Sequence, residues 1–304
     1  MSMHRQGRAG HWQHAPLINP ILRQAAGLGL RLRVRKAAAF WLRSLISPAL
    51  TLRWFRFLAV FTEHKTRMPP HDDILRKSLS TFLVYRMPRR EKLDLLMQHF
   101  EIAGEILRPK VLKTLWQGGT VHAGNVAGRD HTYRLELSLA ENCGCRHEGA
   151  FSLCLKRSDD MALCMASFIF TPAGGGSYSI VIGGMQGPRG EEAKRAVISA
   201  TRDLGGLRPK DAVLLGLRGM MTRSAVSYLM AVSNARHAIN QRAEKRRCRM
   251  RTDLDGYWLE RGGVHFQPFG FRIPFERAAE GGTESRRDAS KAACIKAGAS
   301  VLRH

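Results

Sequence analysis

The sequence predicts an α+β fold in which a helical region precedes an antiparallel meander of strands, and the meander is followed by a helix, a strand and a further helix. Two changes in the spacing of apolar residues lead to this prediction. Up to about residue 116 the apolar positions recur with a period near 3.6, which is typical of amphipathic helices. From Tyr133 to Ile182 they alternate with a period of 2, which is typical of half-buried strands.

The N-terminal part of the chain is basic, and its first 62 residues contain no Asp or Glu. Residues 1–17 lack the apolar stretch of a secretory signal, so we expect a disordered basic arm. Residues 18–116 are expected to be helical, with a break near Pro48. No window of about 18 uncharged apolar residues occurs, which disfavours a membrane-spanning helix. The apolar face of residues 18–61 packs on the core or lies on an anionic membrane; packing is the commoner arrangement, and both stay open.

Four strands are predicted in the meander, each separated from the next by residues that favour turns. The strands span 133–139, 150–155, 163–170 and 178–182, and the turns lie at 141–144, 158–160 and 173–176.

The pattern changes again after the meander. A glycine-rich turn at 183–190 leads into a helix that opens with Glu191 and Glu192, where acidic residues complement the helix dipole. A second helix begins at Pro209, a short strand follows at 228–232, and a basic helix is expected from 235 to about 251. The predicted organisation is a disordered arm at 1–17, a basic helical region at 18–116, an α+β core at 117–276 and a weakly ordered tail at 277–304.

Charge is the outlying property of the composition. The chain has 304 residues, 44% of them hydrophobic, so it can bury a sizeable core. Its formal net charge is +24, which favours anionic partners such as nucleic acid, anionic lipid or a nucleotide cofactor without choosing among them. The alternative is a solvated basic surface that has no dedicated partner. We do not expect a sequence-specific nucleic-acid reader, because no helix-turn-helix, zinc finger or RNA-binding aromatic motif occurs.

The six cysteines follow no zinc-site spacing, so we predict no metal centre. With no secretory signal, reduced thiols are the simpler interpretation. We therefore predict a cytoplasmic location, with peripheral contact at the inner membrane as an alternative. The oligomeric state stays open.

Four motifs resemble the VirK/YbjX family, a group of bacterial proteins that contain a domain of unknown function. In chain order they are Ile182-Gly-Gly-Met-Gln-Gly187, Gly206-Leu-Arg-Pro-Lys210, Ala231-Val-Ser-Asn234 with His237, and Tyr257-Trp-Leu-Glu260 before Gly262-Gly263. The resemblance covers roughly residues 75–274. It implies a bacterial origin and a link to virulence, envelope defence and survival inside hosts, but it implies no particular reaction.

The order of elements after the meander is similar to that of the acetyltransferase-like (GNAT) fold. In that fold a glycine-rich turn and the following helix N-terminus bind the pyrophosphate of coenzyme A. The resemblance predicts that acyl-CoA, or another acyl-thioester donor, is bound by Gln186, Gly187, Arg189 and Gly190. The alternative is a tight turn in which glycine is needed only for positive φ.

The remaining candidates lie after the turn. Asn234 and His237 are three residues apart, which would place them on one helical face, and with Glu260 they are the predicted catalytic residues. His237 would act as a general base with a pKa near neutrality. The alternatives are a helix-capping asparagine, a packed histidine and a glutamate paired with arginine. The predicted substrate-binding residues are Arg208, Lys210, Ser233, Tyr257 and Trp258.

Two classes of function follow from these observations. The first is an acyltransferase-like protein that modifies an envelope component or a peptide in virulence or stress defence. The second is a non-enzymatic basic protein that docks on anionic membrane or nucleic acid. A serine hydrolase is not expected, because Ser233 has no visible Ser-His-Asp arrangement.

Overall fold

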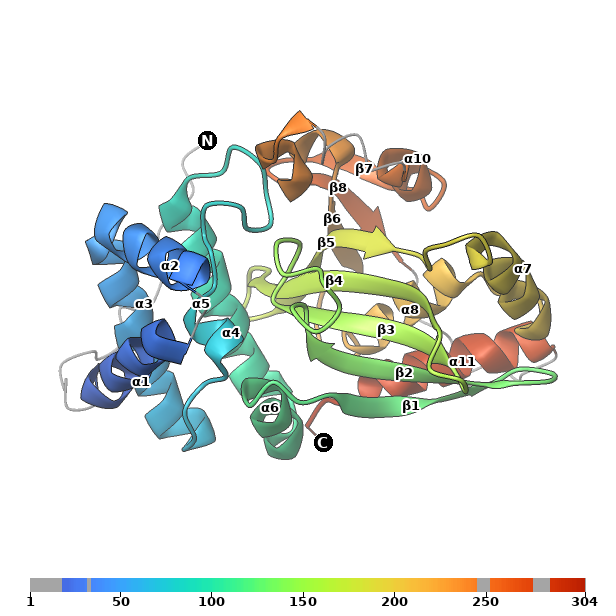
Figure 1. Cartoon of the computed structure of the whole chain (residues 1–304). Helices are drawn as coiled ribbons and strands as arrows, with labels where there is room; N and C mark the ends of the chain where they lie inside the picture. The colour runs from blue at the N-terminus through green and yellow to red at the C-terminus, as the bar shows by residue number, and fades with distance from the viewer. Residues whose placement is uncertain (1–17, 32–33, 245–251, 276–284, 304) are drawn as a thin grey trace. The chain divides into compact units, whose positions relative to one another are not determined.

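The computed structural model describes residues 18–31, 34–244, 252–275 and 285–303, and the chain divides into two units, Met1–Leu75 and Arg76–His304 (Figure 1). The predicted arm at 1–17 lies outside the described residues. The predicted boundary at residue 117 is displaced, because the helices between 89 and 116 belong to the second unit together with the sheet.

The first unit is helical, as the 3.6 period predicts. Pro48 stands at the first position of α3, where its missing N–H costs nothing, and this explains the break before that helix. Trp54 stacks on Phe57, with ring centroids 5.5 Å apart, and its indole N–H donates to the Leu75 carbonyl at 3.3 Å. The elements are α1 (Ile18–Arg31), α2 (Val34–Ile46), α3 (Pro48–Phe61), a π turn (Thr62–Thr66) and α4 (Asp72–Leu75).

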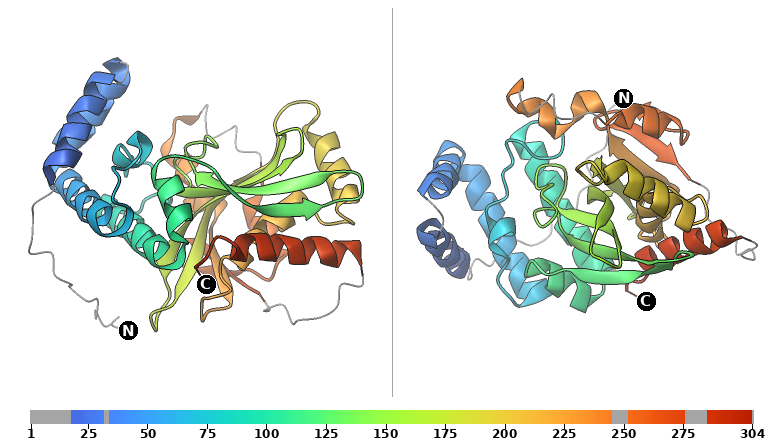
Figure 2. Two further views of the ribbon diagram at one scale, coloured as in Figure 1. Left: turned by 90° about the horizontal axis from the view of Figure 1, so that it is seen from below. Right: turned by 45° about the vertical axis from the view of Figure 1, so that its right-hand side comes forward.

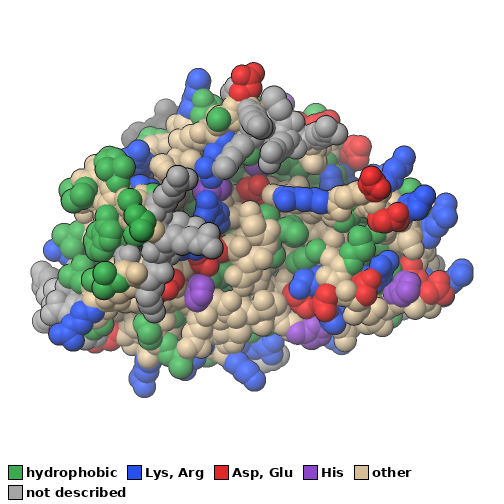
Figure 3. Space-filling model, viewed as in Figure 1, with side chains coloured by type: hydrophobic (Ala, Val, Ile, Leu, Met, Phe, Trp, Pro, Cys, Tyr) green, Lys and Arg blue, Asp and Glu red, His purple; other side chains and the backbone are tan. Residues whose placement is uncertain are grey.

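Among the described residues, no single helix is long and apolar enough to cross a membrane. Ala37–Ile46 and Pro48–Thr66 reach that length and composition only as a pair, and the pair is bent by 107°. Hydrophobic side chains gather at the surface in the part of Figure 3 where Figure 1 labels α2.

One mostly antiparallel sheet dominates the second unit. Within the described ranges its eight strands lie in the order β1-β2-β3-β4-β5-β6-β8-β7. The predicted antiparallel meander is confirmed and gains one strand, β1, at its start. β6 then lies parallel to β5, and β8 is antiparallel to both β6 and β7. The bounds are β1 (Val121–Ala127), β2 (Thr132–Leu139), β3 (Phe151–Arg157), β4 (Ala162–Pro172), β5 (Tyr178–Gln186), β6 (Tyr228–Val232), β7 (Val264–Phe266) and β8 (Gly270–Pro274).

Helices pack against this sheet. His99 of α5 is fully buried and accepts a hydrogen bond from the Phe170 N–H of β4 at 3.0 Å, and burial lowers its pKa to about 3. α8 contacts β3 and β4, and α11 contacts β1 and lies beside α8 (Figure 2). The helices are α5 (Arg89–Ile106), α6 (Pro109–Trp116), α7 (Ala193–Asp203), α8 (Pro209–Gly219), α10 (Leu254–Leu259) and α11 (Arg286–Ala299).

The prediction of a weakly ordered tail is wrong for residues 286–299, which form α11. The buried face of α11 is hardly more apolar than its exposed face, because the helix contacts α8 through small residues rather than through large apolar ones. The sequence pattern therefore gave no clear sign of an amphipathic helix. A Cβ atom on Gly298 would overlap the carbonyl oxygen of Gly216, and one on Gly219 would overlap that of Ile295. The two backbones therefore approach so closely that glycine is required at both crossing positions.

We predict that Gly298→Ala destabilises the protein. Alanine normally stabilises a helix interior by about 0.5–1 kcal/mol relative to glycine, but here overpacking against Gly216 should reverse the sign and cost about 1–3 kcal/mol. Urea denaturation measures the change, and Lys296→Ala, on the exposed side of α11, is the control. Stabilisation by Gly298→Ala would contradict the close crossing.

Candidate functional site

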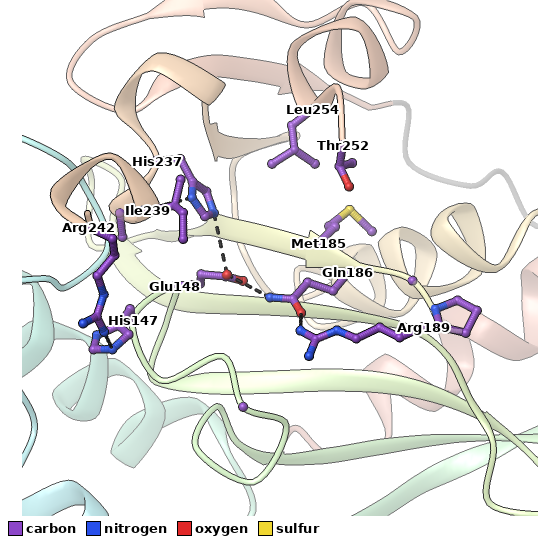
Figure 4. Close-up of a pocket in the computed structure, with 14 residues that line it drawn as sticks. His147, Glu148, Met185, Gln186, Arg189, His237, Ile239, Arg242, Thr252 and Leu254 are labelled. Carbon is purple, nitrogen blue, oxygen red and sulfur yellow. Dashed lines mark hydrogen bonds and ion pairs between the residues drawn. The ribbon is translucent and has the colours of Figure 1, made fainter. Parts of the chain in front are cut away.

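A cavity of about 710 Å³ opens beside the end of β5 (Figure 4). Its walls come from three parts of the second unit that are far apart in sequence: the β2–β3 connection, the end of β5, and the segment after β6. The lining residues include Gly144, His147, Glu148, Met185, Gln186, Gly187, Pro188, Arg189, His237, Ile239, Arg242, Thr252 and Leu254.

The pairing of β5 with β6 explains why space exists here. The two strands are parallel partners at only two positions, Val181 with Met230 and Ile182 with Ala231. β5 then continues to Gln186, whereas β6 ends at Val232. The cavity lies beyond these pairs, where β5 has no parallel neighbour.

Two glycines of β5 leave room for the carboxyl group of Glu148, the buried acidic group of the site. The pairing of β4 with β5 shifts register so that Gly183 is the extra residue of a bulge. A Cβ atom on Gly183 would overlap the backbone carbonyl of Glu148, and one on Gly184 would overlap its carboxyl group. Glycine inside a strand often marks the close approach of another backbone, and here it lets Glu148 rest directly on the sheet.

The carboxyl group of Glu148 begins a chain of hydrogen bonds. Its Oε1 accepts from the Gln186 amide at 2.9 Å, and Gln186 Oε1 accepts from the Arg189 guanidinium at 2.8 Å (Figure 4). Burial raises the pKa of Glu148 to about 7, although the hydrogen bond from Gln186 and the charge of Arg189 act in the opposite direction. This carboxyl can therefore take up or release a proton near neutral pH.

His237 lies against the same carboxyl. Its Nδ1 accepts a hydrogen bond from the Ile239 N–H at 3.2 Å, so in the neutral ring the proton is on Nε2, which lies 3.8 Å from Glu148 Oε1. Burial lowers the pKa of His237 to about 4, so the predicted pKa near neutrality is wrong. The Nε2–H of His237 therefore faces Glu148 at a distance too long for a hydrogen bond, and His237 is poorly suited to be the base.

The predicted helix from 235 to 251 is also wrong where the structure describes it. Two short 3-10 turns, Asn234–Arg236 and Ala238–Gln241, flank His237, whose backbone is extended and forms a bridge with Val84. Asn234 and His237 therefore do not share a helical face. Residues 245–251 lie outside the described part of the chain.

His147 fixes the loop that carries Glu148. Its Nε2 accepts hydrogen bonds from the guanidinium N–H groups of Arg146, at 3.0 Å, and of Arg242. Nδ1 is then the protonated nitrogen and donates to Thr81 Oγ1 at 2.7 Å. Arg242 and Arg189 thus bring positive charge to the wall of a cavity that also contains a buried carboxyl.

Four of the predicted site residues line this cavity, namely Gln186, Gly187, Arg189 and His237. Gly190 has φ of 97° in the turn before α7, as the alternative interpretation of the glycine turn requires. Asn234 holds α10: its side-chain oxygen accepts from the Leu254 N–H at 3.3 Å, and its own N–H donates to Asp255 at 2.7 Å.

The other predicted residues lie apart from the cavity lining. Ser233 is buried and accepts from the Arg236 N–H at 3.3 Å. Tyr257 donates to Asp211 at 2.9 Å, and Lys210 Nζ lies 5.0 Å from the centre of its ring. Trp258 is fully buried.

Glu260 belongs to this second cluster as well. Its side chain is 64% exposed and lies 3.9 Å from Arg208 and 3.2 Å from Arg261. The prediction that Glu260 joins His237 in one site is therefore not supported by the geometry, and the arginine pairing left open from the sequence is what the structure contains.

Glu148, His147, Arg242 and Met185 line the cavity but were not predicted. Glu148 and His147 stand in a connection without regular structure, and no spacing rule links them to β5. The sequence contains one sign of this contact, the pair Gly183-Gly184 inside a strand. Such glycines indicate that another segment approaches the strand closely, but they do not show which segment it is.

The model of a family described as "Protein of unknown function (DUF535)" matches residues 31–284. The chain belongs to the DUF535 family. A curated relative, "Uncharacterized protein YbjX" of Escherichia coli (strain K12), is 23% identical over 241 residues, which cover 79% of this chain and 72% of the relative. The resemblance to the VirK/YbjX family is confirmed. No solved structure matches this DUF535 protein.

We predict that Gly183→Ala lowers the stability of this DUF535 protein by at least about 2 kcal/mol, because the added methyl group meets the Glu148 backbone. Gly187→Ala is the matched control: it lies four residues further on, lines the same cavity and has no atom within 4 Å of a Cβ at that position. Thermal and urea unfolding compare the two. Equal effects would contradict the seating of Glu148 on β5.

The raised pKa of Glu148 predicts a pH-dependent stability. Between pH 4.5 and about 7 the unfolded carboxyl has lost its proton while the folded one keeps it, so this group lowers the free energy of unfolding as the pH rises. Glutamine at position 148 does not titrate, so Glu148→Gln removes the decrease in the free energy of unfolding that this group causes. Its stability relative to wild type should therefore grow with pH across this window, by roughly 3 kcal/mol at most.

His237 contributes the opposite slope between pH 4 and 6.5, but it is present in both proteins and cancels in the difference. Urea unfolding at a series of pH values measures the effect. A difference between the two proteins that does not change with pH would show that Glu148 titrates normally.

Proposed function

We propose that this protein is an acyltransferase, which moves an acyl group from a thioester donor to an amine of an envelope component or a peptide. One observation carries the proposal. The cavity that opens where β5 and β6 part holds the buried carboxyl of Glu148 between its Gln186–Arg189 chain and His237, and Arg242 also lines it.

The order of the elements supports this assignment. The antiparallel strands end in β5, a crossover through α7 and α8 follows, and β6 returns parallel to β5. The resemblance to the acetyltransferase-like fold was predicted from this same order of strands and helices. In such an arrangement the thioester arm of the donor lies between the two parallel strands where they separate, and a donor in that position would have its reacting carbon near Met185 and Glu148.

The anionic part of the donor is assigned to the arginines. Glu191 and Glu192 stand at the start of α7 and are exposed, so they would repel a pyrophosphate at that helix end. Arg189 and Arg242 line the cavity and supply the opposite charge. The donor would therefore be a thioester with a phosphate-bearing carrier, such as acyl-CoA.

Glu148 is the proposed general base. In its carboxylate form it takes the proton of the acceptor amine as the nitrogen attacks the thioester carbonyl carbon. A C–N bond forms, the C–S bond breaks, and Glu148, now protonated, passes that proton to the departing sulfur, which leaves as the thiol. The neutral His237 presents its Nε2–H to Glu148 and does not accept the amine proton, because its Nδ1 already accepts from Ile239.

Release of free thiol from acetyl-CoA, with a panel of polyamines and peptides as acceptors, tests the proposal. Glu148→Gln should lower kcat by about 100-fold or more and leave acetyl-CoA binding, measured by calorimetry, nearly unchanged. The wild-type rate should rise with pH up to about 7, since only the carboxylate of Glu148 can accept a proton. Arg189→Ala should mainly weaken donor binding.

Glu260→Gln is the comparison variant, because Glu260 is exposed and lies in the second cluster. Loss of activity in Glu260→Gln with full activity in Glu148→Gln would overturn the assignment of the base. Absence of acyl-CoA binding by the wild-type protein would overturn the assignment of the donor.

A further inference from the structure

The first unit exposes apolar side chains that its own core does not use. Eight of the thirteen exposed large hydrophobic residues in the described part of the chain lie between positions 22 and 52. Leu45 is 75% exposed, and Leu42 and Ile46 are 58% and 59% exposed. Single exposed apolar residues are ordinary, but a concentration on one unit indicates a surface with a partner.

The helix α2 gathers most of this surface on one face. Positions 34, 38, 41, 42, 45 and 46 follow the spacing of one side of a helix, and the residues there are Val34, Ala38, Trp41, Leu42, Leu45 and Ile46, all exposed. Phe40 is buried on the opposite side. α2 therefore has two apolar faces, and only one of them is used inside the unit.

The charges of α1, α2 and α3 are of one sign. Arg23, Arg43, Arg53 and Arg56 are exposed, and no acidic residue occurs before Glu63. A helical unit that exposes both an apolar face and arginines complements anionic lipid, whose headgroups attract the guanidinium groups while the acyl boundary accepts the apolar side chains. Trp41 has the amphipathic ring that is enriched at such boundaries.

The lengths of the helices agree with binding in the plane of the membrane. α2 has 13 residues and α3 has 14, each shorter than the roughly 20 residues that a bilayer requires. The two meet at a bend of 107° and so do not form one straight span.

We propose that the first unit docks on an anionic membrane surface, with the exposed face of α2 in the headgroup region and the exposed arginines of α1 to α3 on the lipid phosphates. A second copy of the chain fits this face less well than a membrane does. A symmetric contact would bring the same arginines together, and residues 1–62 contain no acidic residue to pair with them. Nucleic acid would use the arginines but leave the apolar face exposed to water.

Co-sedimentation of the full-length protein with vesicles tests the proposal. The vesicles are made of phosphatidylcholine alone or of phosphatidylcholine with phosphatidylglycerol. We expect binding to the phosphatidylglycerol vesicles, weakened by added salt, and a loss of about tenfold or more in the double variant Leu42→Glu/Ile46→Glu.

Leu259→Glu/Val264→Glu is the matched control, since these two residues are 54% and 57% exposed and lie in the second unit. This variant adds the same charge and should bind as the wild type does. Circular dichroism and thermal unfolding establish that each variant folds, and Leu42→Ser/Ile46→Ser replaces the glutamate variant if that one unfolds.

Three results would overturn the proposal. One is the absence of binding to phosphatidylglycerol vesicles, and another is an equal loss in the two double variants. The third is a dimer in sedimentation velocity that dissociates in Leu42→Glu/Ile46→Glu, because this would assign the face to a second copy. DNA binding that is equal in the wild type and in Leu42→Glu/Ile46→Glu supports the proposal. It would show that the arginines still bind an anion when the apolar face no longer binds the membrane.

Discussion

The contact of Glu148 with the bulge of β5 is the constraint on which the rest of the site depends. A strand that carried side chains at 183 and 184 would push the β2–β3 connection away from the sheet. The carboxyl group would then reach water, and its pKa would return toward the ordinary value, because burial is the largest cause of the shift. The two glycines thus fix both where the acid lies and how strongly it holds its proton.

A second set of interactions holds that connection from the other side. Lys77, almost fully buried, bonds the Glu141 carboxylate at 2.6 Å and the Gly149 carbonyl at 2.7 Å. Leu83 N–H donates to the His147 carbonyl at 2.7 Å, from a backbone with φ of 56°. The connection is therefore clamped between the sheet and the segment from 77 to 84, although it has no regular structure of its own. Packing and hydrogen bonds from these neighbours thus hold Glu148 in place, although it stands in a loop.

Much of this architecture could be predicted from the sequence, and the failures have physical causes. Alternation identified β2 to β5 because each has clear apolar positions, whereas β1 offers few large apolar residues and β7 is exposed along its length. α11 was missed because glycine and alanine mediate its packing. The segment after β6 has a helical composition, but backbone hydrogen bonds to the segment at 84–85 and capping by Ser233 and His237 favour short turns. Gln186, Arg189 and His237 were found by motif, while Glu148 came from a distant loop that no local pattern joins to β5.

The position of α11 has a consequence for the synthesis of the chain. Residues 286–303 contact β1 and α8, and Arg303 donates hydrogen bonds to the carbonyls of Gly104, in the last turn of α5, and of Leu107, just after it. The first strand of the sheet therefore acquires its cover only after more than 150 further residues have been made. On the ribosome, β1 and its neighbours are made before the helix that covers one of their faces, so we expect that face to stay exposed until the residues of α11 have emerged.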